Sequence, residues 1–414
     1  MTTAPARADW PKPEDFAAAP STADLRRWDE ADAAARPQRL ARLRARMASE
    51  GIDAYFGVRP EHMRYLAGLA FGNGEEKVAG HSGQFLVGTD DVVVLADTRY
   101  TIQAQREAMG ARIEPVTYNL AAAWPALVAS LGARRLGVEA GFVNHALWER
   151  LRAAAPDVEL VPVEGWVEAD RATKEPAELE RVAAACAVAD RALAVLLPDI
   201  RPGVTEKDLA LRLEWLMRTG GAESLAFDIA CLAGPEAALP HGSPGDRPVL
   251  DGAVLLFDFG AQVAGYRSDM TRTLFVGEPT ARDLDVYDVV FRSQQAAMDA
   301  VAAAVVAATN GQPLPDGKSI DSIARAVIDA DGRWPAYGHG LGHGIGLATH
   351  EGPGLSRSSP ETPLPTPTVF SVEPGIYLEN EMGVRIEDLV AIDAAAARMD
   401  RLTMFPRGVL VVGS

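Results

Sequence analysis

The 414-residue chain is longer than a usual single domain of roughly 100–200 residues, so two domains are expected. Its 48% hydrophobic and 23% charged residues exclude a largely disordered chain. A net charge of −17 and a pI near 4.9 argue against nucleic acid and anionic membranes as partners, because both are bound through positive patches.

The first half of the chain predicts an N-terminal extension and an α/β domain. Residues 1–35 are rich in Ala, Pro and charge without sustained periodicity, so we expect an extension. Over residues 36–168, helical and strand patterns alternate, beginning with Leu40, Leu43 and Met47 on one helical face. This half has no dense cluster of His and acidic residues, which favours a scaffold or oligomerisation domain.

A second domain of mixed helices and strands is expected over residues 174–414. Pro176 stands at a helix start and is followed by a long helical pattern. Thr205 is the expected N-cap of the next helix, and Gly220 is its expected end. Later helices are expected over 287–306 and 319–332, and strands over 254–261, 269–276, 368–378 and 385–392.

Two strand-like runs joined by a Gly-containing turn predict a hairpin that carries Asp258 and Asp269. With the turn centred near Val263 and Ala264, the two aspartates become cross-strand neighbours. Two carboxylates that close repel each other, and a divalent cation between them would remove the repulsion. The alternative is an exposed hairpin with two solvated acids.

A second hairpin repeats the arrangement with longer acids. Glu373 and Glu387 lie on strand-like runs on either side of a polar turn, so both can point at one spot. The nearby acids Glu379, Glu381 and Asp388 are interpreted as turn or outward-facing residues.

A segment with alternating glycines carries three of the seven histidines, His339, His343 and His350. The glycines argue against a helix and for an extended strand, on which His339 and His343 face the same way. A lone histidine is more often structural, but three within twelve residues favour a site. His241 joins them from a loop that precedes the first hairpin.

Four carboxylates with one imidazole form a hard, oxygen-rich ligand set that suits a pair of Mn²⁺, Co²⁺ or Zn²⁺ ions. Two such ions can activate a bridging water and polarise a carbonyl, which favours amide hydrolysis. Sequence signatures of serine hydrolases, P-loop proteins, zincins and thioredoxins are absent.

Cysteine usage and hydropathy address the cellular setting. Cys186 and Cys231 are the only cysteines, too few for a disulfide framework, which favours a reducing cytoplasmic setting. The chain has no apolar leader and no run of about 18 apolar residues, so neither export nor a membrane partner is expected.

The motifs DFG with SDMTRT, HGLGHGIGLATHE, SVEPGIY and RIEDLV closely resemble those of the pita-bread metallopeptidases. Fragments such as HMRYLAGL and LTMFPRGVLVV resemble the branch of aminopeptidase P and prolidase, so the resemblance covers most of the chain. It implies a two-domain α/β protein, with an N-terminal creatinase-like α/β domain and a C-terminal α+β pita-bread catalytic domain.

The resemblance also implies a role for each site residue. Asp258 would bind one metal ion, Asp269 and Glu387 would bridge two, and His343 and Glu373 would complete the other. Glu373 would act as general base or proton shuttle, and Arg385 would orient or neutralise the carboxylates. Thr271 shares a strand face with Asp269 and is expected to be a hydrogen-bond partner behind the ligands. His241 and His350 would contact the scissile carbonyl or the leaving amine, and His339 would line the pocket. The family further implies Mn²⁺ ahead of Co²⁺ or Zn²⁺, and a homodimer.

The implied activity is hydrolysis of the Xaa-Pro bond in small peptides with proline at the second position. Strict dipeptidases carry an arginine after the HE step, where this chain has Gly354, so an aminopeptidase is favoured, although Arg357 could substitute. A lyase on this fold carries another aspartate where this chain has Gly260. The remaining alternatives are a non-peptidase hydrolase of small amides or amidines, similar to ectoine hydrolase, and a non-catalytic binding protein.

Overall fold

The chain forms two compact units in a computed structural model, which describes residues 6–71, 83–116 and 119–413. One unit comprises Arg26–Asp170, and the other comprises Met1–Leu25 together with Arg171–Ser414. Helix α1 (Thr22–Glu50) begins inside the segment predicted to be a plain extension. Its second half carries the predicted helical face of Leu40, Leu43 and Met47, whereas its first half was missed because Trp28 is the only buried residue before Arg39.

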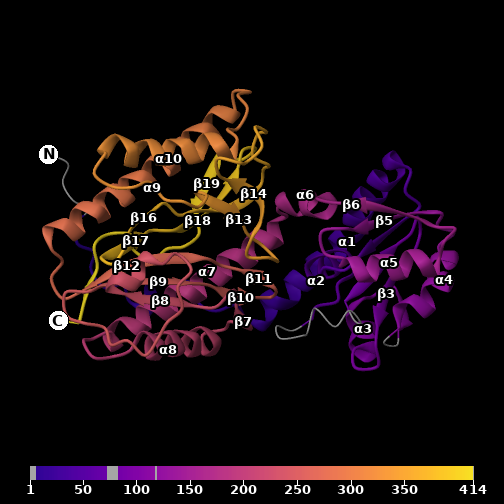
Figure 1. Ribbon diagram of the computed structural model, residues 1–414, viewed down its shortest axis with the longest axis horizontal. Helices are drawn as coiled ribbons and strands as arrows, with labels where there is room; N and C mark the ends of the chain where they lie inside the picture. Colours follow the sequence, from indigo (N-terminus) through magenta and orange to yellow (C-terminus); the bar gives the residue numbers. More distant parts are fainter. Residues whose placement is uncertain (1–5, 72–82, 117–118, 414) are drawn as a thin grey trace. The chain divides into compact units, whose positions relative to one another are not determined.

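The Arg26–Asp170 unit is built on a six-stranded mixed sheet in the order β4-β3-β2-β1-β5-β6 (Figure 1). Its central strands are apolar on both faces, because helices and loops cover both sides. Trp124 of α4 packs edge-on against Phe56 of β1 at the centre of this core. The helices after α1 are α2 (Pro60–Ala67), α3 (Thr101–Glu107), α4 (Leu120–Ser130), α5 (His145–Ala154) and α6 (Trp166–Ala172). The strands are β1 (Ala54–Gly57), β2 (Gln84–Val87), β3 (Val92–Ala96), β4 (Arg112–Pro115), β5 (Arg135–Glu139) and β6 (Glu159–Val163).

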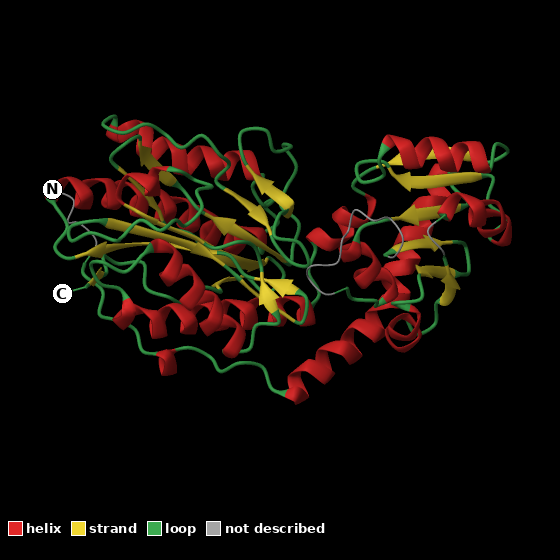
Figure 2. Cartoon of the chain, turned by 60° about the horizontal axis from the view of Figure 1, so that its bottom comes forward, coloured by secondary structure: helices red, strands yellow, loops and turns green. Residues whose placement is uncertain are grey.

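The larger unit is an α+β structure in which sheets lie between two pairs of helices, α7 with α8 and α9 with α10 (Figures 1 and 2). The helices are α7 (Pro176–Leu196), α8 (Glu206–Thr219), α9 (Ala281–Ala308) and α10 (Gly317–Asp331). Its sheets have the strand orders β11-β10-β7, β20-β12-β9-β8, β14-β13-β15-β18-β19 and β16-β17. The strands are β7 (Ser224–Leu225), β8 (Ala230–Ala233), β9 (Val254–Phe259), β10 (Ala261–Val263), β11 (Tyr266–Arg267), β12 (Met270–Val276), β13 (Gly342–Gly344), β14 (Glu351–Leu355), β15 (Thr368–Val372), β16 (Gly375–Leu378), β17 (Met382–Arg385), β18 (Asp388–Asp393), β19 (Arg398–Arg401) and β20 (Val411–Val412).

Local sequence signals place α7 and α8 where the sequence predicts them, whereas α9 begins at Ala281, six residues before the predicted start. Pro176 is the first residue of α7, where its missing amide costs nothing. The Thr205 side chain accepts a hydrogen bond from the Asp208 amide and so caps α8, which ends at Gly220. The buried faces of α9 and α10 share one apolar core with β15 and β18, and this core supports the strands that carry the site.

The start of the chain is bound to its end within this unit. The Ala8 amide donates to the Val409 carbonyl at 2.9 Å, and the Trp10 indole donates to the Val411 carbonyl at 2.8 Å. The Phe16 ring stacks on Phe405. The unit is therefore discontinuous in sequence. Among the described residues, no helix is both long and apolar enough to cross a bilayer.

Candidate metal centre and active site

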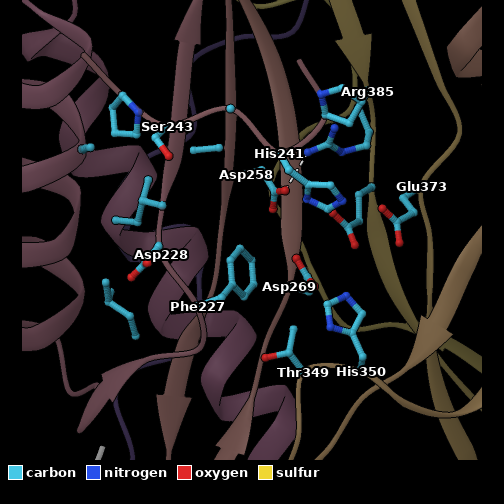
Figure 3. Close-up of a pocket in the computed structure, with 18 of the residues that line it drawn as sticks. Phe227, Asp228, His241, Ser243, Asp258, Asp269, Thr349, His350, Glu373 and Arg385 are labelled. Atoms are coloured by element: carbon cyan, nitrogen blue, oxygen red, sulfur yellow. Dashed lines mark hydrogen bonds and ion pairs between the residues drawn. The ribbon is translucent and has the colours of Figure 1, made fainter. Parts of the chain in front are cut away.

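A cavity of about 850 Å³ in the larger unit brings together all nine residues that the sequence singles out for metal binding or catalysis. Figure 3 shows carboxylates and imidazoles that approach the same space from strands and loops far apart in the sequence. The nine are Asp258, Asp269, His343, Glu373, Glu387, His241, His339, His350 and Arg385.

The first hairpin forms, but its turn lies one residue later than the sequence suggests. Val263 pairs with Tyr266, so the turn residues are Ala264 and Gly265, which both have positive φ. Asp258 consequently pairs with Thr271, and Asp269 lies diagonally across the hairpin. Direct pairing of the two aspartates was therefore wrong, because the left-handed turn conformation sets the register.

The same register explains the glycine between the two aspartates. A Cβ at Gly260 would lie 1.9 Å from the Ser268 carbonyl oxygen, so the backbone leaves no space for a side chain there. The extra aspartate of the lyase alternative does not fit this hairpin.

The second hairpin places Glu373 and Glu387 opposite one another. Val372 pairs with Asp388 in one ladder and Gly375 pairs with Arg385 in the next, with the same register in both. The two glutamates occupy the gap between these ladders. There their backbones leave regular pairing and their side chains enter the cavity.

Donor atoms from three of the five predicted ligands lie within 4.8 Å of one another: those of Asp269, His343 and Glu387. The His343 Nε2 atom lies 3.6 Å from Asp269 Oδ2 and 3.4 Å from Glu373 Oε1. The fourth acid, Asp258, faces the cluster while Arg385 holds one of its oxygens.

The electrostatics of this cluster call for a cation. Burial, followed by repulsion from Glu387 and Asp258, raises the pKa of Asp269 well above its usual value. Burial and repulsion from Glu373 and Asp258 do the same to the pKa of Glu387, and burial raises the pKa of Glu373. Asp258 Oδ1 and Glu387 Oε1 are buried without a hydrogen-bond partner. Because such oxygens are costly to leave unmatched, the donor set fits divalent metal ions.

Arg385 is the centre of a hydrogen-bond network behind the acids. Its Nη2 donates to Asp258 Oδ2 at 2.6 Å, its Nε to Thr271 Oγ1 at 2.9 Å and its Nη1 to the Tyr377 hydroxyl at 2.9 Å. Thr271 in turn donates to Glu387 Oε2 at 2.7 Å, so it orients Glu387 although the sequence paired it with Asp269.

Tyr377 is a residue that sequence reasoning missed. Its hydroxyl lies 2.9 Å from Arg385 and 2.8 Å from His339 Nε2, so it joins the two. Alternation along an extended strand puts residues 373 and 377 on one face, and this signal could have found it.

Burial lowers the pKa of three of the cavity histidines. Burial, then the charges of His343 and His241, lowers the pKa of His350 to about 4. Burial also lowers the pKa of His343 and of His339. The His343 and His350 rings lie 4.2 Å apart between centroids. Only His343 lies in a strand, since β13 is confined to Gly342–Gly344, but His339 reaches the cavity as well.

Asp388 does not face outward as the sequence suggested. It is fully buried beside Glu387, where Arg272 donates to it at 2.7 Å and Thr403 at 2.6 Å. The pattern was misleading because alternation along β18 exposes no face: five of its six residues are buried.

The cavity extends beyond the acids to a wall that the sequence did not indicate. Phe227, Asp228 and Ser243 lie on the far side from Glu373 in Figure 3. Helix α8 adds Lys207 and Leu211 to this wall. Arg357, a possible substitute for the missing arginine, is exposed and is not among the described residues that line the cavity.

Comparisons with known proteins match both parts of the chain to known families. Residues 180–394 match metallopeptidase family M24, and residues 39–173 match the creatinase/prolidase N-terminal domain. The uncharacterized peptidase YqhT of Bacillus subtilis strain 168 is 34% identical over 374 residues, which are 90% of this chain and 100% of that protein.

Two solved structures are similar over nearly their whole length. An Xaa-Pro dipeptidase from Bacillus anthracis has a TM-score of 0.80 at 32% identity and covers 91% of this chain and 99% of its own. An X-Pro aminopeptidase from Thermotoga maritima has a TM-score of 0.78 at 32% identity and covers 90% of this chain and 99% of its own. The expected two-domain fold, with a creatinase-like first domain, is confirmed.

Proposed function

The chain belongs to metallopeptidase family M24, and from that premise we propose that it hydrolyses the bond before proline in small peptides. As a member of this family it is a metal-dependent peptidase. One observation carries the proposal: four carboxylates, His343 and three further histidines converge on a single cavity. Relatives named for Xaa-Pro cleavage match nearly the whole chain, which favours this substrate over small amides or amidines.

We propose that Asp258, Asp269, His343, Glu373 and Glu387 hold two metal ions. The support is the donor chemistry: four carboxylates and one imidazole face one cavity, and the Asp258 Oδ1 and Glu387 Oε1 atoms are buried without a hydrogen-bond partner. When bound, such ions lower the pKa of a water molecule and polarise the scissile carbonyl. Mn²⁺ is the first candidate for this carboxylate-rich set, ahead of Co²⁺ and Zn²⁺.

The protein's own groups then divide the remaining work. Glu373 accepts a proton from the attacking water and holds it for the departing proline nitrogen, while Ser371 fixes its Oε1 at 3.0 Å. His350 and His241 hydrogen-bond the scissile carbonyl and the leaving amine from the cavity wall. Arg385 keeps Asp258 in place, and His339 borders the substrate.

Peptide cleavage by metal-loaded protein tests the proposal. The protein loaded with Mn²⁺ should release Xaa from Xaa-Pro or Xaa-Pro-Yaa peptides, and Glu373→Gln should lose that activity while its circular dichroism spectrum stays unchanged. Absence of turnover of every proline peptide with Mn²⁺, Co²⁺ and Zn²⁺, combined with turnover of a cyclic amidine, would favour the ectoine-hydrolase-like alternative.

Peptide length is the second question for the same assay, because one similar structure is a dipeptidase and another is an aminopeptidase. We propose a preference for Xaa-Pro-Yaa over Xaa-Pro, supported by the cavity volume of about 850 Å³ and by Gly354 at the position of the expected arginine. We propose a homodimer on the basis of the family resemblance. We propose a cytoplasmic setting because the two cysteines are buried and free of disulfides. Light scattering tests the dimer.

A further inference from the structure

Glu351 follows the candidate catalytic residue His350 directly, yet it is not one of the described residues that line the cavity. Its carboxylate is turned into the protein, where only 3% of the side chain is exposed. There it meets two cations: Arg171, which donates to Oε2, and Lys174, whose Nζ lies 2.7 Å from Oε1. The side chains of Arg171 and Lys174 are 2% and 0% exposed. We call these three residues the Glu351 cluster.

The Glu351 cluster is bound to the loop that carries His350. The Ala348 amide donates to Glu351 Oε2 at 3.3 Å. Glu351 is also the strand partner of Gly344, the residue after His343, where the β13–β14 ladder has a bulge. The two histidines whose rings lie 4.2 Å apart therefore each adjoin one member of the Gly344–Glu351 strand pair.

The cluster also holds the strand that leads to Glu373. The Lys174 amide donates to the Pro367 carbonyl at 2.7 Å, and Thr368 Oγ1 donates to the Ala172 carbonyl at 2.7 Å. Lys174 Nζ additionally donates to the Arg171 carbonyl at 2.5 Å. One short segment thus fixes the His350 loop and the first residue of β15 together.

The loop backbone fits closely around the cluster. A Cβ at Gly346 would lie 2.5 Å from Glu351 Oε1 and 3.2 Å from Lys174 Cε, so this glycine is required by close approach. On its other side the loop is fixed by Arg267, which donates to Thr349 Oγ1 at 2.8 Å. Removal of the Glu351 charge would leave two buried cations facing a loop that has no other carboxylate among its described residues 345–351.

We propose that Glu351, held by Arg171 and Lys174, is the positioning residue that sets His350 against the substrate. The inference rests on the proposed function for the role of His350, but the contacts that carry it do not involve the cavity. A catalytic group displaced by about 1 Å costs on the order of a hundredfold in rate. The cluster is built to prevent that displacement.

The test is a double-mutant cycle between Glu351→Gln and His350→Ala, with kcat, KM and metal content measured for each protein. Glu351→Gln alone should lower kcat about 10- to 100-fold, with KM within about threefold of wild type and full metal content. In the His350→Ala background the same change should lower kcat less than about twofold. An equal loss in both backgrounds, or no loss in folded Glu351→Gln protein, would overturn the proposal.

Two further variants complete the design. Lys174→Met keeps the Arg171–Glu351 pair, so it replaces Glu351→Gln in the test if that variant does not fold. It should lower kcat by a smaller factor, about three- to tenfold, and this loss should disappear in the His350→Ala background. Asp190→Asn is the matched control. Asp190 is a buried carboxylate that accepts hydrogen bonds from the backbone amides of Met404 and Phe405. It is far from His350 in sequence and does not line the cavity. The kcat of Asp190→Asn should equal that of wild type.

Hydrogen exchange gives a readout that needs no turnover. In Glu351→Gln the amides of residues 346–351 should exchange at least tenfold faster than in wild type, whereas Asp190→Asn leaves them unchanged. Unchanged exchange in Glu351→Gln would contradict the positioning role. Wild-type protein that cleaves no proline peptide would instead overturn the proposed function, and exchange alone would then decide whether Glu351 orders the loop.

Discussion

Arg385 Nη2 lies 2.6 Å from Asp258 Oδ2, and the same guanidinium donates to Thr271 and Tyr377. Because three donors in one planar group serve three acceptors, lysine cannot replace it. We expect Arg385→Lys to lower kcat about 10-fold and Arg385→Met about 100-fold. Steady-state kinetics on an Xaa-Pro-Yaa peptide check this order. Equal activity of the lysine variant and wild type would show that charge alone suffices.

Metal binding should stabilise the protein through the acidic cluster. Ligand at a hundred times its Kd adds about 2.7 kcal/mol to the free energy of unfolding. Mn²⁺ added to the metal-free protein should therefore raise its Tm, and EDTA should reverse the rise. Asp269→Asn should abolish most of it, since this buried carboxylate lies at the centre of the cluster. A rise of the same size in Asp269→Asn would place the metal elsewhere.

The ion pair of Arg272 with Asp388 should matter far more for stability than the pair of Arg282 with Glu381. Both have N–O distances of 2.7 Å, but the first is buried and the second is half exposed. Arg272→Met should lower the free energy of unfolding by about 3–5 kcal/mol, because it removes the nearest cation of a buried carboxylate and the donor to the Pro406 and Phe405 carbonyls. Arg282→Met should cost less than about 1 kcal/mol. Urea unfolding of the metal-free proteins measures both, and similar losses would contradict the burial argument.

The buried carboxyl group of Asp190 predicts that the stability of the protein falls as the pH rises from about 4 to about 7. Burial raises its pKa from 3.8 to about 7, against the opposing effect of the Met404 and Phe405 amides. Because the folded-state pKa is the higher one, the stabilisation by the bound proton is complete below pH 3.8 and is lost as pH rises through about 7. Relative to Asp190→Asn, wild type should lose about 2–3 kcal/mol between pH 5 and 8. A pH-independent difference between the two would show that Asp190 stays ionised in the folded protein.

Lys207 is the cation on the cavity wall that a substrate carboxylate could meet, since its Nζ is 3.7 Å from Asp246 and largely exposed. An exposed ion pair is worth up to about 1 kcal/mol, or roughly fivefold in binding. Lys207→Met should raise KM for an Xaa-Pro dipeptide by about that factor and leave KM for its C-terminal amide unchanged. Lys318→Met, which removes an exposed lysine paired with Glu361, is the control. An equal rise in KM for the dipeptide and for its C-terminal amide would show that Lys207 does not bind the substrate carboxylate.

The nine site residues that line the cavity could be chosen as candidates from the sequence, because they lie in short motifs. The distances between their side chains could not be predicted. The first hairpin shows the reason: its register depends on positive φ at Ala264 and Gly265, and alanine gives no sign of that conformation. Asp388 shows a second limit. A buried acid and an exposed acid look alike in sequence, and Asp388 is distinguished only by tertiary contacts such as the one with Arg272, 116 positions away.

The Glu351 cluster illustrates a third limit. Arg171 and Lys174 stand 180 and 177 positions before their partner, and near a helix start they resemble ordinary solvated charges. The start of α8, by contrast, follows from local chemistry, the Thr205 cap, so it could be placed in advance. Pairings between distant charges are set by tertiary structure, and a single sequence holds no record of them.

The bonds that join Ala8 to Val409 and Trp10 to Val411 have a consequence for how the enzyme is made. Ala8 is synthesised some 400 residues before Val409. At 5–20 residues per second, this separates the synthesis of the two residues by roughly 20–80 s. The Arg26–Asp170 unit can fold during that interval, while the unit that holds the cavity cannot be completed until its last strand arrives. The two units therefore reach their folded state at different times, the Arg26–Asp170 unit first and the unit that holds the cavity last.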